Sequence, residues 1–205
     1  MKLLLVDDHA IVREGVRRLL ADIPDAQIAE ADNGTTALAM FKKDRPDVVL
    51  LDLNLDGIAG LELLRRMLIE DRTARVIVFS MHSEPVYAAR ALKLGARGYV
   101  SKSAASDELV AAVRKVADGG RYVERELASE LAVGQFSGED PLSELTTREV
   151  EILRMLGEGM SLTQIANANG VSYKTVANSC SLMKTKLGVE RTADLIRMSI
   201  ELFQK

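Results

Sequence analysis

The sequence predicts a doubly wound α/β domain followed by a small all-α domain, and three observations carry this prediction. Five short apolar segments alternate with five segments of helical spacing in the first 120 residues, whereas every candidate element beyond residue 142 is helical. The alternation indicates a five-stranded parallel sheet with helices on both faces, because a parallel crossover needs a long connection. The length of 205 residues fits two compact units, each with its own core.

Each strand and each helix of the first domain can be located from its residues. The expected strands are Leu3–Val6, Ile28–Ala31, Val48–Leu51, Val76–Phe79 and Gly98–Val100. The expected helices are Ile11–Leu20, Thr35–Lys42, Gly60–Ile69, Val86–Leu94 and Glu108–Ala117. Because the third and fourth strands are apolar throughout, we expect them at the buried centre of the sheet.

A change of pattern separates the two domains. Gly134–Pro141 concentrates residues that interrupt regular structure, so we expect a first domain over 1–120, a linker over 121–141 and a second domain over 142–205. The second domain should contain four helices, Thr146–Glu158, Ser161–Asn169, Ser172–Leu187 and Thr192–Phe203. Thr146 with Glu149, and Ser161 with Gln164, have the spacing of a capping box and should begin two of these helices.

The composition limits the class of protein without identifying its function. Apolar residues make up 47% and charged residues 28%, as in an ordinary globular protein. No segment approaches the ~20 apolar residues of a membrane span, and two acids follow the opening apolar residues, so we expect a cytoplasmic protein with no membrane partner. The net charge is −3, and the residues from Leu142 onward carry eight Lys and Arg against seven Asp and Glu. Charge alone therefore does not indicate a nucleic-acid partner.

Acidic residues follow the expected strands at positions that should meet. The carboxyl ends of parallel strands form one edge of a doubly wound sheet, so Asp7-Asp8, Asp52, Ser80 and Lys102 should share a crevice there. Carboxylates that converge in this way need a cation, and Mg²⁺ prefers carboxylate oxygens, water and phosphate. A lysine and a hydroxyl beside them suit the oxygens of a phosphoryl group. The pattern predicts phosphoryl transfer onto a carboxylate.

These residues, in this order along about residues 1–120, resemble the receiver domain of bacterial response regulators. The resemblance implies a flavodoxin-like fold in which a sensor histidine kinase phosphorylates Asp52. Asp8 and Asp52 would ligate Mg²⁺ together with the backbone carbonyl of Asn54, and Asp7 would act through water. Lys102 and Ser80 would contact the phosphoryl group. Ser80 and Tyr99 would form a switch pair that converts the new charge into a change of surface.

Two positions depart from the common receiver pattern. Asp56 stands where many receivers have proline, and it adds negative charge beside the expected pocket. Ser103 stands where proline in a cis bond often follows the pocket lysine, so a cis bond is not expected here. His9 and His82 are too few, and too far apart in sequence, to indicate a metal site, and we expect both at the rim of the pocket or on the surface.

A helix-turn-helix is expected within residues 161–187, with Asn169-Gly170-Val171 as its turn. One face of its second helix carries an apolar stripe of Val176, Cys180, Met183 and Leu187, so the single cysteine should be buried. The opposite face should contact DNA through Lys174, Thr175, Ala177, Asn178, Ser181 and Lys184.

About sixty residues of this tail resemble the DNA-binding domain shared by the LuxR, FixJ and NarL families, from Leu145-Thr146 through Val171-Ser172 to Lys186-Leu187-Gly188-Val189. Ala177 and Ser179 depart from that pattern and leave the base preference open. The resemblance implies a transcriptional response regulator that binds promoter DNA as a homodimer when phosphorylated. Such a protein is not an enzyme, although it accepts phosphate and would slowly lose it.

Three other interpretations remain open at this stage. A haloacid-dehalogenase-like phosphohydrolase also uses a strand-end aspartate with Mg²⁺, but it usually carries a second aspartate where this chain has Asn54. A signalling module would act through protein contacts without binding DNA. The helical tail could also serve only for contacts between protein chains.

Overall fold

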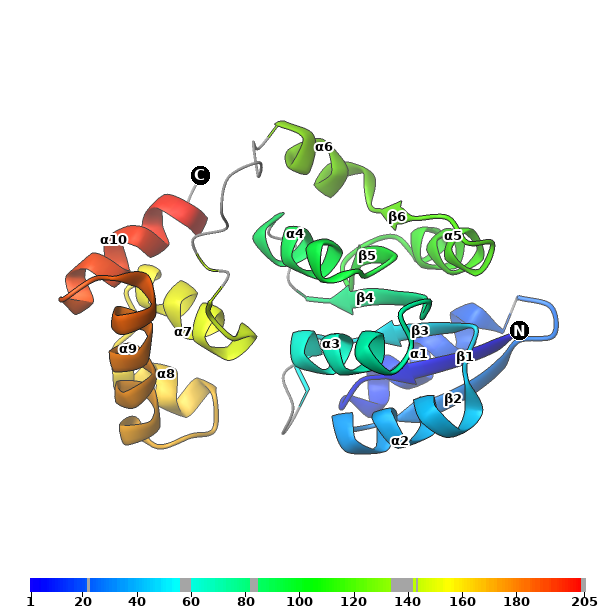
Figure 1. The fold of residues 1–205 in the computed structure, drawn as a ribbon, viewed down its shortest axis with the longest axis horizontal. Coiled ribbons are helices and arrows are strands. Elements are labelled where there is room, and N and C mark those ends of the chain that lie inside the picture. The colour runs from blue at the N-terminus through cyan, green and yellow to red at the C-terminus, as the bar shows by residue number, and fades with distance from the viewer. Residues whose placement is uncertain (22, 56–59, 82–84, 134–141, 143, 204–205) are drawn as a thin grey trace. The chain divides into compact units, whose positions relative to one another are not determined.

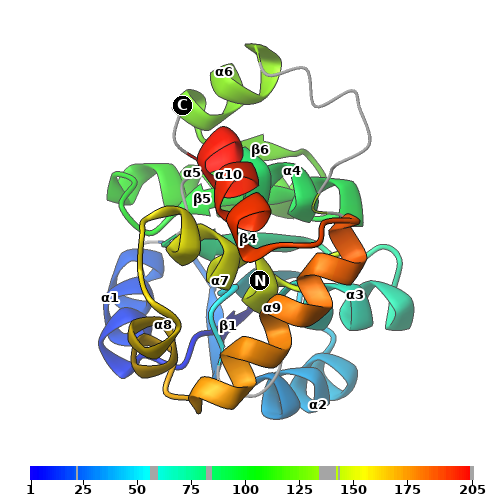
Figure 2. The ribbon, with the colours of Figure 1, turned by 90° about the vertical axis from the view of Figure 1, so that its left-hand side faces the viewer.

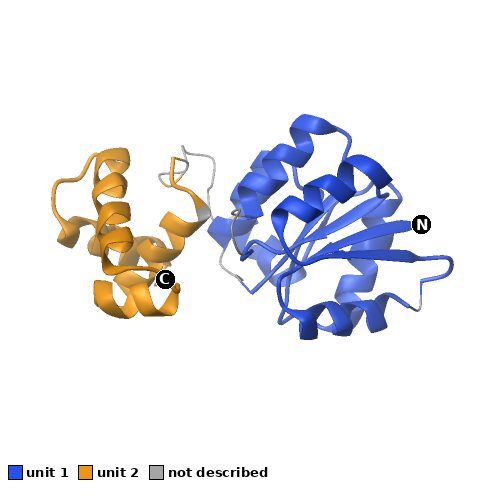
Figure 3. Ribbon diagram, turned by 90° about the horizontal axis from the view of Figure 1, so that it is seen from below, with its two compact units in different colours: residues 1–137 blue, residues 138–205 orange. Residues whose placement is uncertain are grey.

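The structure is a computed structural model that describes residues 1–21, 23–55, 60–81, 85–133, 142 and 144–203. The chain forms two compact units, Met1–Ser137 and Gly138–Lys205 (Figure 3). We describe each unit by itself.

The first unit is built around a six-stranded parallel sheet in the order β2-β1-β3-β4-β5-β6 (Figure 1). Its strands are β1 (Lys2–Val6), β2 (Gln27–Ala31), β3 (Val48–Leu51), β4 (Val76–Ser80), β5 (Gly98–Ser101) and β6 (Tyr122–Val123). Its helices are α1 (Ala10–Leu20), α2 (Gly34–Asp44), α3 (Gly60–Glu70), α4 (Pro85–Leu94), α5 (Ser106–Ala117) and α6 (Arg125–Val133). The doubly wound parallel architecture expected from the sequence is confirmed.

Helices cover both faces of the sheet, with α1 and α5 on one face and α2, α3 and α4 on the other (Figure 2). Every residue of β3 and β4 is buried, as expected for central strands with helices on both sides. Beneath α1 and α5, a core cluster joins Leu3, Leu5, Leu50 and Ile77 of the sheet to Val113 of α5. This core holds the ends of β1, β3, β4 and β5 together at one edge, where the polar residues follow.

The expected number of five strands is wrong by one, because β6 and α6 lie within the segment 121–141 that was expected to be a linker. The backbone N–H of Tyr122 donates to the carbonyl of Arg97 at 3.0 Å, which places β6 on the edge of β5. A strand of two residues has no periodicity to detect, and only the edge of β5 determines it. Beyond β6, the Glu124 carboxylate accepts a hydrogen bond from the backbone N–H of Ser101 at 3.0 Å.

The second unit contains the helices α7 (Thr147–Gly157), α8 (Leu162–Ala168), α9 (Tyr173–Leu187) and α10 (Thr192–Phe203). Both expected capping boxes are present, at the starts of α7 and α8. Gly170, with φ of 62°, makes the turn between α8 and α9, and Gly188, with φ of 66°, ends α9 in the left-handed conformation that favours glycine. In the described part of the chain, no helix has both the length and the apolar character that crossing a membrane requires.

Candidate functional site

The acidic residues lie at the carboxyl ends of β1 and β3, which are neighbours in the sheet. Val6 pairs with Leu51, so Asp7 and Asp52 leave the two strands side by side, and the backbone N–H of Asp52 donates to the Val6 carbonyl at 2.9 Å. The side chains of both are nearly inaccessible, with residue exposures of 1% for Asp7 and 2% for Asp52. The sheet therefore fixes two carboxylates together in a buried position.

Lys102 reaches this pair from the end of β5. Its Nζ donates to Asp52 Oδ2 at 2.6 Å and lies 2.7 Å from Asp7 Oδ2. The lysine side chain is only 6% exposed, so the ammonium is shielded from solvent along with the carboxylates. A charged group held in this position can bind an oxygen of an anionic ligand beside Asp52.

Asp8 and His9 complete a group of possible metal ligands. Asp7, Asp8, His9 and Asp52 each offer a ligand atom, and these atoms all lie within 4.8 Å of one another. Asp7 Oδ2 and Asp8 Oδ1 are buried, and neither forms a hydrogen bond of good geometry with the described residues, although each lies close to a nitrogen. Buried carboxylate oxygens that lack such bonds favour a hard divalent cation, so the residues present fit Mg²⁺.

The titration of the pocket follows from burial and from this charge arrangement. Burial raises the pKa of Asp52, and the nearby Asp7 raises it further, while the Lys102 hydrogen bond opposes both. Burial acts to lower the pKa of Lys102, but its close contacts with the carboxylates of Asp52 and Asp7 outweigh burial and raise the pKa. One ammonium thus faces more negative charge than it can neutralise, and this favours a cation at the site.

The other residues expected at the site lie on β4 and β5 and just beyond β3. Ser80 ends β4 and is fully buried, and its carbonyl accepts a hydrogen bond from the backbone N–H of Lys102 at 2.8 Å. Tyr99 lies on β5 with its side chain fully buried. The backbone N–H of Asn54 donates to Asp52 Oδ1 at 3.2 Å. Lys102 and Ser103 are joined in trans, as expected without proline. Asp56 and His82 lie outside the described residues.

Two residues contribute to the pocket in ways that the sequence did not reveal. His9 was expected at the rim or surface and is exposed, yet its Nδ1 lies 2.6 Å from Asp8 Oδ1 and its backbone N–H donates to Asp7 Oδ1 at 2.8 Å. Arg13 of α1 donates through Nη1 to the Asp7 carbonyl at 2.7 Å. An arginine six residues after Asp7, one turn into the next helix, is a weak signal in the sequence, and its role becomes clear only from the fold.

In the second unit, α9 presents a polar face and buries the opposite one. Val176, Cys180 and Met183 are buried, so the expected apolar stripe is confirmed for these residues, and burial raises the pKa of the Cys180 thiol. On the polar face, Lys174, Thr175, Asn178 and Ser181 are exposed, and Ala177 and Lys184 are half-buried. The Thr175 hydroxyl lies 2.9 Å from the hydroxyl of Ser172, the residue that caps α9, so Thr175 also helps to begin this helix.

A partly buried ion pair joins α7 to α9. Lys186 Nζ donates to both carboxylate oxygens of Glu149, at 2.9 and 2.7 Å. The same carboxylate accepts from the backbone N–H of Thr146 at 2.7 Å within the capping box. Burial acts to raise the pKa of Glu149, but the Lys186 and Thr146 hydrogen bonds outweigh it and lower the pKa. The pair fixes the orientation of α9 within this unit.

Comparison with known families agrees with both units. Residues 3–114 match the response regulator receiver domain, and residues 143–199 match the bacterial regulatory proteins of the luxR family. The first match covers the strands that carry Asp7, Asp52 and Lys102, and the second covers the four helices up to Ser199.

Individual proteins match over nearly the whole chain. The methanol utilization control regulatory protein MoxX of Paracoccus denitrificans is 38% identical over 207 residues, which span 100% of this chain and 93% of MoxX. The transcriptional activator protein ExaE of Pseudomonas putida is 39% identical over 206 residues, which span 98% of this chain and 96% of ExaE.

A solved structure of RcsB from Salmonella enterica serovar Typhimurium, bound to the promoter P1flhDC in the presence of the phosphomimetic BeF3⁻, covers 98% of both chains with 26% identity and a TM-score of 0.64. The protein therefore belongs to the response regulators that join a receiver domain to a LuxR-family DNA-binding domain, a family of transcription regulators and not of classical enzymes.

Proposed function

We propose that a sensor histidine kinase phosphorylates this protein on Asp52 and that phosphorylation controls its binding to promoter DNA. The observation that carries the proposal is the buried Asp52 carboxylate, which lies 2.6 Å from Lys102 and beside the carboxylates of Asp7 and Asp8. The pocket thus brings together an acceptor carboxylate, a cationic side chain and carboxylates that could hold a metal ion, and these groups suit phosphoryl transfer to a carboxylate.

In the transfer step, an oxygen of Asp52 forms a bond to the phosphorus of the kinase phosphohistidine. The phosphorus–nitrogen bond breaks, and its electron pair returns to the imidazole ring, so the product is an acyl phosphate on Asp52. The ammonium of Lys102 binds the Asp52 carboxylate before transfer and a phosphoryl oxygen after it. The hydroxyl of Ser80 donates a hydrogen bond to another phosphoryl oxygen. These two residues act through charge and position, without forming a covalent bond.

Mg²⁺ would be held by Asp8, Asp52 and the backbone carbonyl of Asn54, with Asp7 acting through water. When bound, the ion supplies the positive charge that allows an anionic phosphoryl group to approach three carboxylates. The buried oxygens of Asp7 and Asp8 without good hydrogen bonds support this assignment.

Ser80 and Tyr99 would transmit the phosphorylated state. Ser80 pairs with Ser101 in the sheet, and Tyr99 lies two residues before Ser101 on β5. A movement of the Ser80 hydroxyl toward the phosphoryl group frees space that the Tyr99 ring, buried in this structure, can occupy. The acyl phosphate would be lost slowly to water, since Asn54 supplies no acid or base at the position where phosphohydrolases usually carry aspartate.

A phosphorylation assay tests the acceptor. We expect one phosphoryl group on the full chain after treatment with a small phosphodonor and Mg²⁺, measured by intact mass, and none without the metal or in the Asp52→Ala variant. Asp118→Asn removes an exposed acid at the end of α5 and should behave as the wild type. Labelling of Asp52→Ala to the wild-type level would refute the assignment, and release of phosphate over many turnovers would favour an enzyme.

The polar face of α9 is the proposed DNA surface. Lys174 and Lys184 would contact phosphates, Asn178 suits the edge of adenine, and Thr175, Ala177 and Ser181 allow close approach to the major groove. The second domain has nearly balanced charge, so a single copy makes few phosphate contacts, and two copies on adjacent half-sites would compensate. The promoter complex of RcsB, formed with a phosphomimetic, supports this role.

The DNA proposal has its own test. We expect phosphorylated wild-type protein to retard genomic promoter fragments more strongly than unphosphorylated protein, as a complex of two chains per site by light scattering. The Asn178→Ala variant should still accept phosphate but lose sequence preference. Equal affinity in both phosphorylation states would contradict the control by phosphorylation, whereas no DNA binding in either state would favour a module that acts through protein contacts alone.

A further inference from the structure

A second cavity in the receiver unit gathers four arginines at the end of the sheet opposite the phosphoryl site. Arg65, Arg72, Arg97 and Arg121 line a cavity of about 420 Å³. Arg97 directly precedes β5, Arg121 directly precedes β6, and Arg65 and Arg72 lie on and just beyond α3, which can be located in Figure 1. These are the amino ends of the strands, so the cavity shares no residue with the acidic pocket.

The positive charge at this cavity is largely uncompensated. Arg72, Arg97 and Arg121 form no ion pair or side-chain hydrogen bond with any residue that the structure describes. Arg65 lies 3.7 Å from Glu62, whose carboxylate already accepts a 2.8 Å hydrogen bond from Arg66. Other arginines of this unit do have carboxylate partners, among them Arg13, Arg17, Arg18 and Arg45. Like charges gathered in one hollow repel one another, and a bound anion relieves that repulsion.

Exposed aliphatic side chains lie among the arginines. Leu68, Ile69 and Leu94 also line the cavity, and Ile69 and Leu94 are 69% and 41% exposed. Large aliphatic groups are rarely left so accessible without a reason when they lie together. A ligand with an apolar or planar part as well as several negative charges would cover them.

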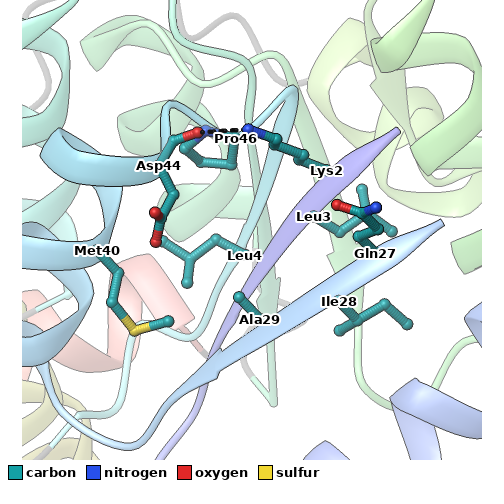
Figure 4. Close-up of a pocket in the computed structure, with 9 residues that line it drawn as sticks. All are labelled: Lys2, Leu3, Leu4, Gln27, Ile28, Ala29, Met40, Asp44 and Pro46. Atoms are coloured by element: carbon teal, nitrogen blue, oxygen red, sulfur yellow. Dashed lines mark hydrogen bonds between the residues drawn. The ribbon is translucent and has the colours of Figure 1, made fainter.

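Another cavity of the receiver lacks such an excess of charge. It measures about 290 Å³ and lies at the start of β1 and β2 beside α2, with Lys2 and Asp44 as its charged residues (Figure 4). Lys2 Nζ donates to the backbone carbonyl of Asp44 at 3.4 Å, and the rest of the lining is uncharged. The two cavities thus differ in net charge, and only the one lined by arginines favours an anionic ligand.

We propose that the cavity lined by Arg65, Arg72, Arg97 and Arg121 binds a small molecule that carries two or more phosphate groups, such as a nucleoside polyphosphate. Guanidinium groups bind phosphate oxygens through paired hydrogen bonds, and several around one hollow select for several linked phosphates. The cavity has the size of a small-molecule site, and its few lining residues fall far short of the area that a stable protein interface buries. A phosphate-rich ligand is therefore favoured over an acidic segment of another protein.

Calorimetric titration of the full chain in Mg²⁺-free buffer tests the proposal, with tripolyphosphate and ATP as probes and orthophosphate as the singly phosphorylated comparison. We expect saturable binding of both probes and at least about ten-fold weaker binding of orthophosphate, because each charged hydrogen bond lost costs about this factor. The Arg72→Gln/Arg97→Gln variant should bind both probes at least about ten-fold more weakly than the wild type.

Two matched controls locate the site. Arg114→Gln removes an exposed arginine of α5 that does not line the cavity, and it should leave binding unchanged. Lys174→Gln/Lys184→Gln removes the basic groups of α9 and should also leave it unchanged. The proposal is overturned if neither probe saturates, if binding persists in Arg72→Gln/Arg97→Gln, or if it is lost in the α9 variant. It is also overturned if an acidic amphipathic peptide binds the cavity and the phosphates do not.

Discussion

Lys102 lies 50 residues beyond Asp52 in the sequence, and its ammonium donates to Asp52 Oδ2 at 2.6 Å while it stands 2.7 Å from Asp7 Oδ2. This single positive group, shared between two buried carboxylates with Asp8 beside them, leaves the pocket with excess negative charge. The arrangement suits the cation and the phosphoryl group that we propose for this site, and we expect it to lower the stability of the fold when neither is bound.

Replacing Asp52 with asparagine should therefore stabilise the receiver unit in Mg²⁺-free buffer at neutral pH, by roughly 1 kcal/mol or a few degrees of melting temperature. Burial raises the Asp52 pKa above its ordinary value of 3.8, so the folded state binds more protons than the unfolded state between 3.8 and the raised value. Stability should fall as the pH rises through that window, and Asp52→Asn should flatten the fall. Thermal unfolding across pH measures both effects, and a lower melting temperature for Asp52→Asn than for Asp118→Asn would contradict them.

Adding Mg²⁺ should raise the melting temperature of the wild-type receiver. An ion that binds only the folded state contributes about 2.7 kcal/mol when its concentration is a hundred times the Kd. Asp8→Asn should lose most of this gain because it removes a ligand whose Oδ1 is buried, and a chelator should reverse the gain in the wild type. An equal response to Mg²⁺ in Asp8→Asn and wild type would place the ion elsewhere.

Gly60→Ala should disturb the acceptor directly. A Cβ at Gly60 would lie 2.5 Å from the carbonyl oxygen of Asp52 and closer still to Leu53 Cα, so α3 and the strand end must separate. We expect a loss of about 2 kcal/mol in unfolding free energy and slower phosphorylation of Asp52. Gly15→Ala is the matched control, since a Cβ there meets nothing within 4 Å, and it should stabilise α1 by about 0.5–1 kcal/mol. Phosphorylation of Gly60→Ala at the wild-type rate would rule out this steric link.

Lys186→Met should destabilise the second unit by about 2 kcal/mol at neutral pH, because it leaves the Glu149 carboxylate buried with fewer partners. The Glu149 pKa is lowered in the folded state, so the pair stabilises the fold above the unfolded value near 4.5 and ceases to do so as the pH falls through the folded pKa. Hydrogen exchange at the amides of α7 and α9 measures the stability of the second unit separately from that of the receiver. The difference between wild type and Lys186→Met should shrink below pH 4.5, whereas Lys184→Met should show little difference at any pH.

Ala177→Lys should strengthen binding to DNA of any sequence. One added phosphate contact increases the slope of log affinity against log salt by about 0.9 and raises affinity most at low salt. Fluorescence anisotropy over a salt series measures the slope. Ala193→Lys adds the same charge at an exposed position on α10 and should leave the slope unchanged. Equal slopes for the two variants would show that the polar face of α9 does not contact the backbone of DNA.

Much of the fold could be predicted because its signals are local. Central strands such as Val48–Leu51 are unbroken apolar runs. The capping residues Thr146 and Ser161 mark where their helices begin. The acidic pocket could also be predicted, since a parallel sheet brings its strand ends to one edge and the pocket residues stand at or just after the ends of strands.

The remaining features depend on contacts between distant parts of the chain. β6 exists because β5 offers an unpaired edge to Tyr122 and Val123, and two residues carry no pattern of their own. The arginine cavity is formed by α3, the C-terminal end of α4 and the residues just before β5 and β6. Two of its arginines, Arg65 and Arg121, are 56 residues apart in the sequence. The sequence by itself determined the order of helices and strands, because each has its own periodicity. It also determined which charged residues lie at the strand ends, because they follow the apolar runs directly. Only the tertiary structure decided which carboxylate oxygens lack hydrogen bonds of good geometry and which arginines line one cavity, because both depend on distances between residues that lie far apart in the sequence.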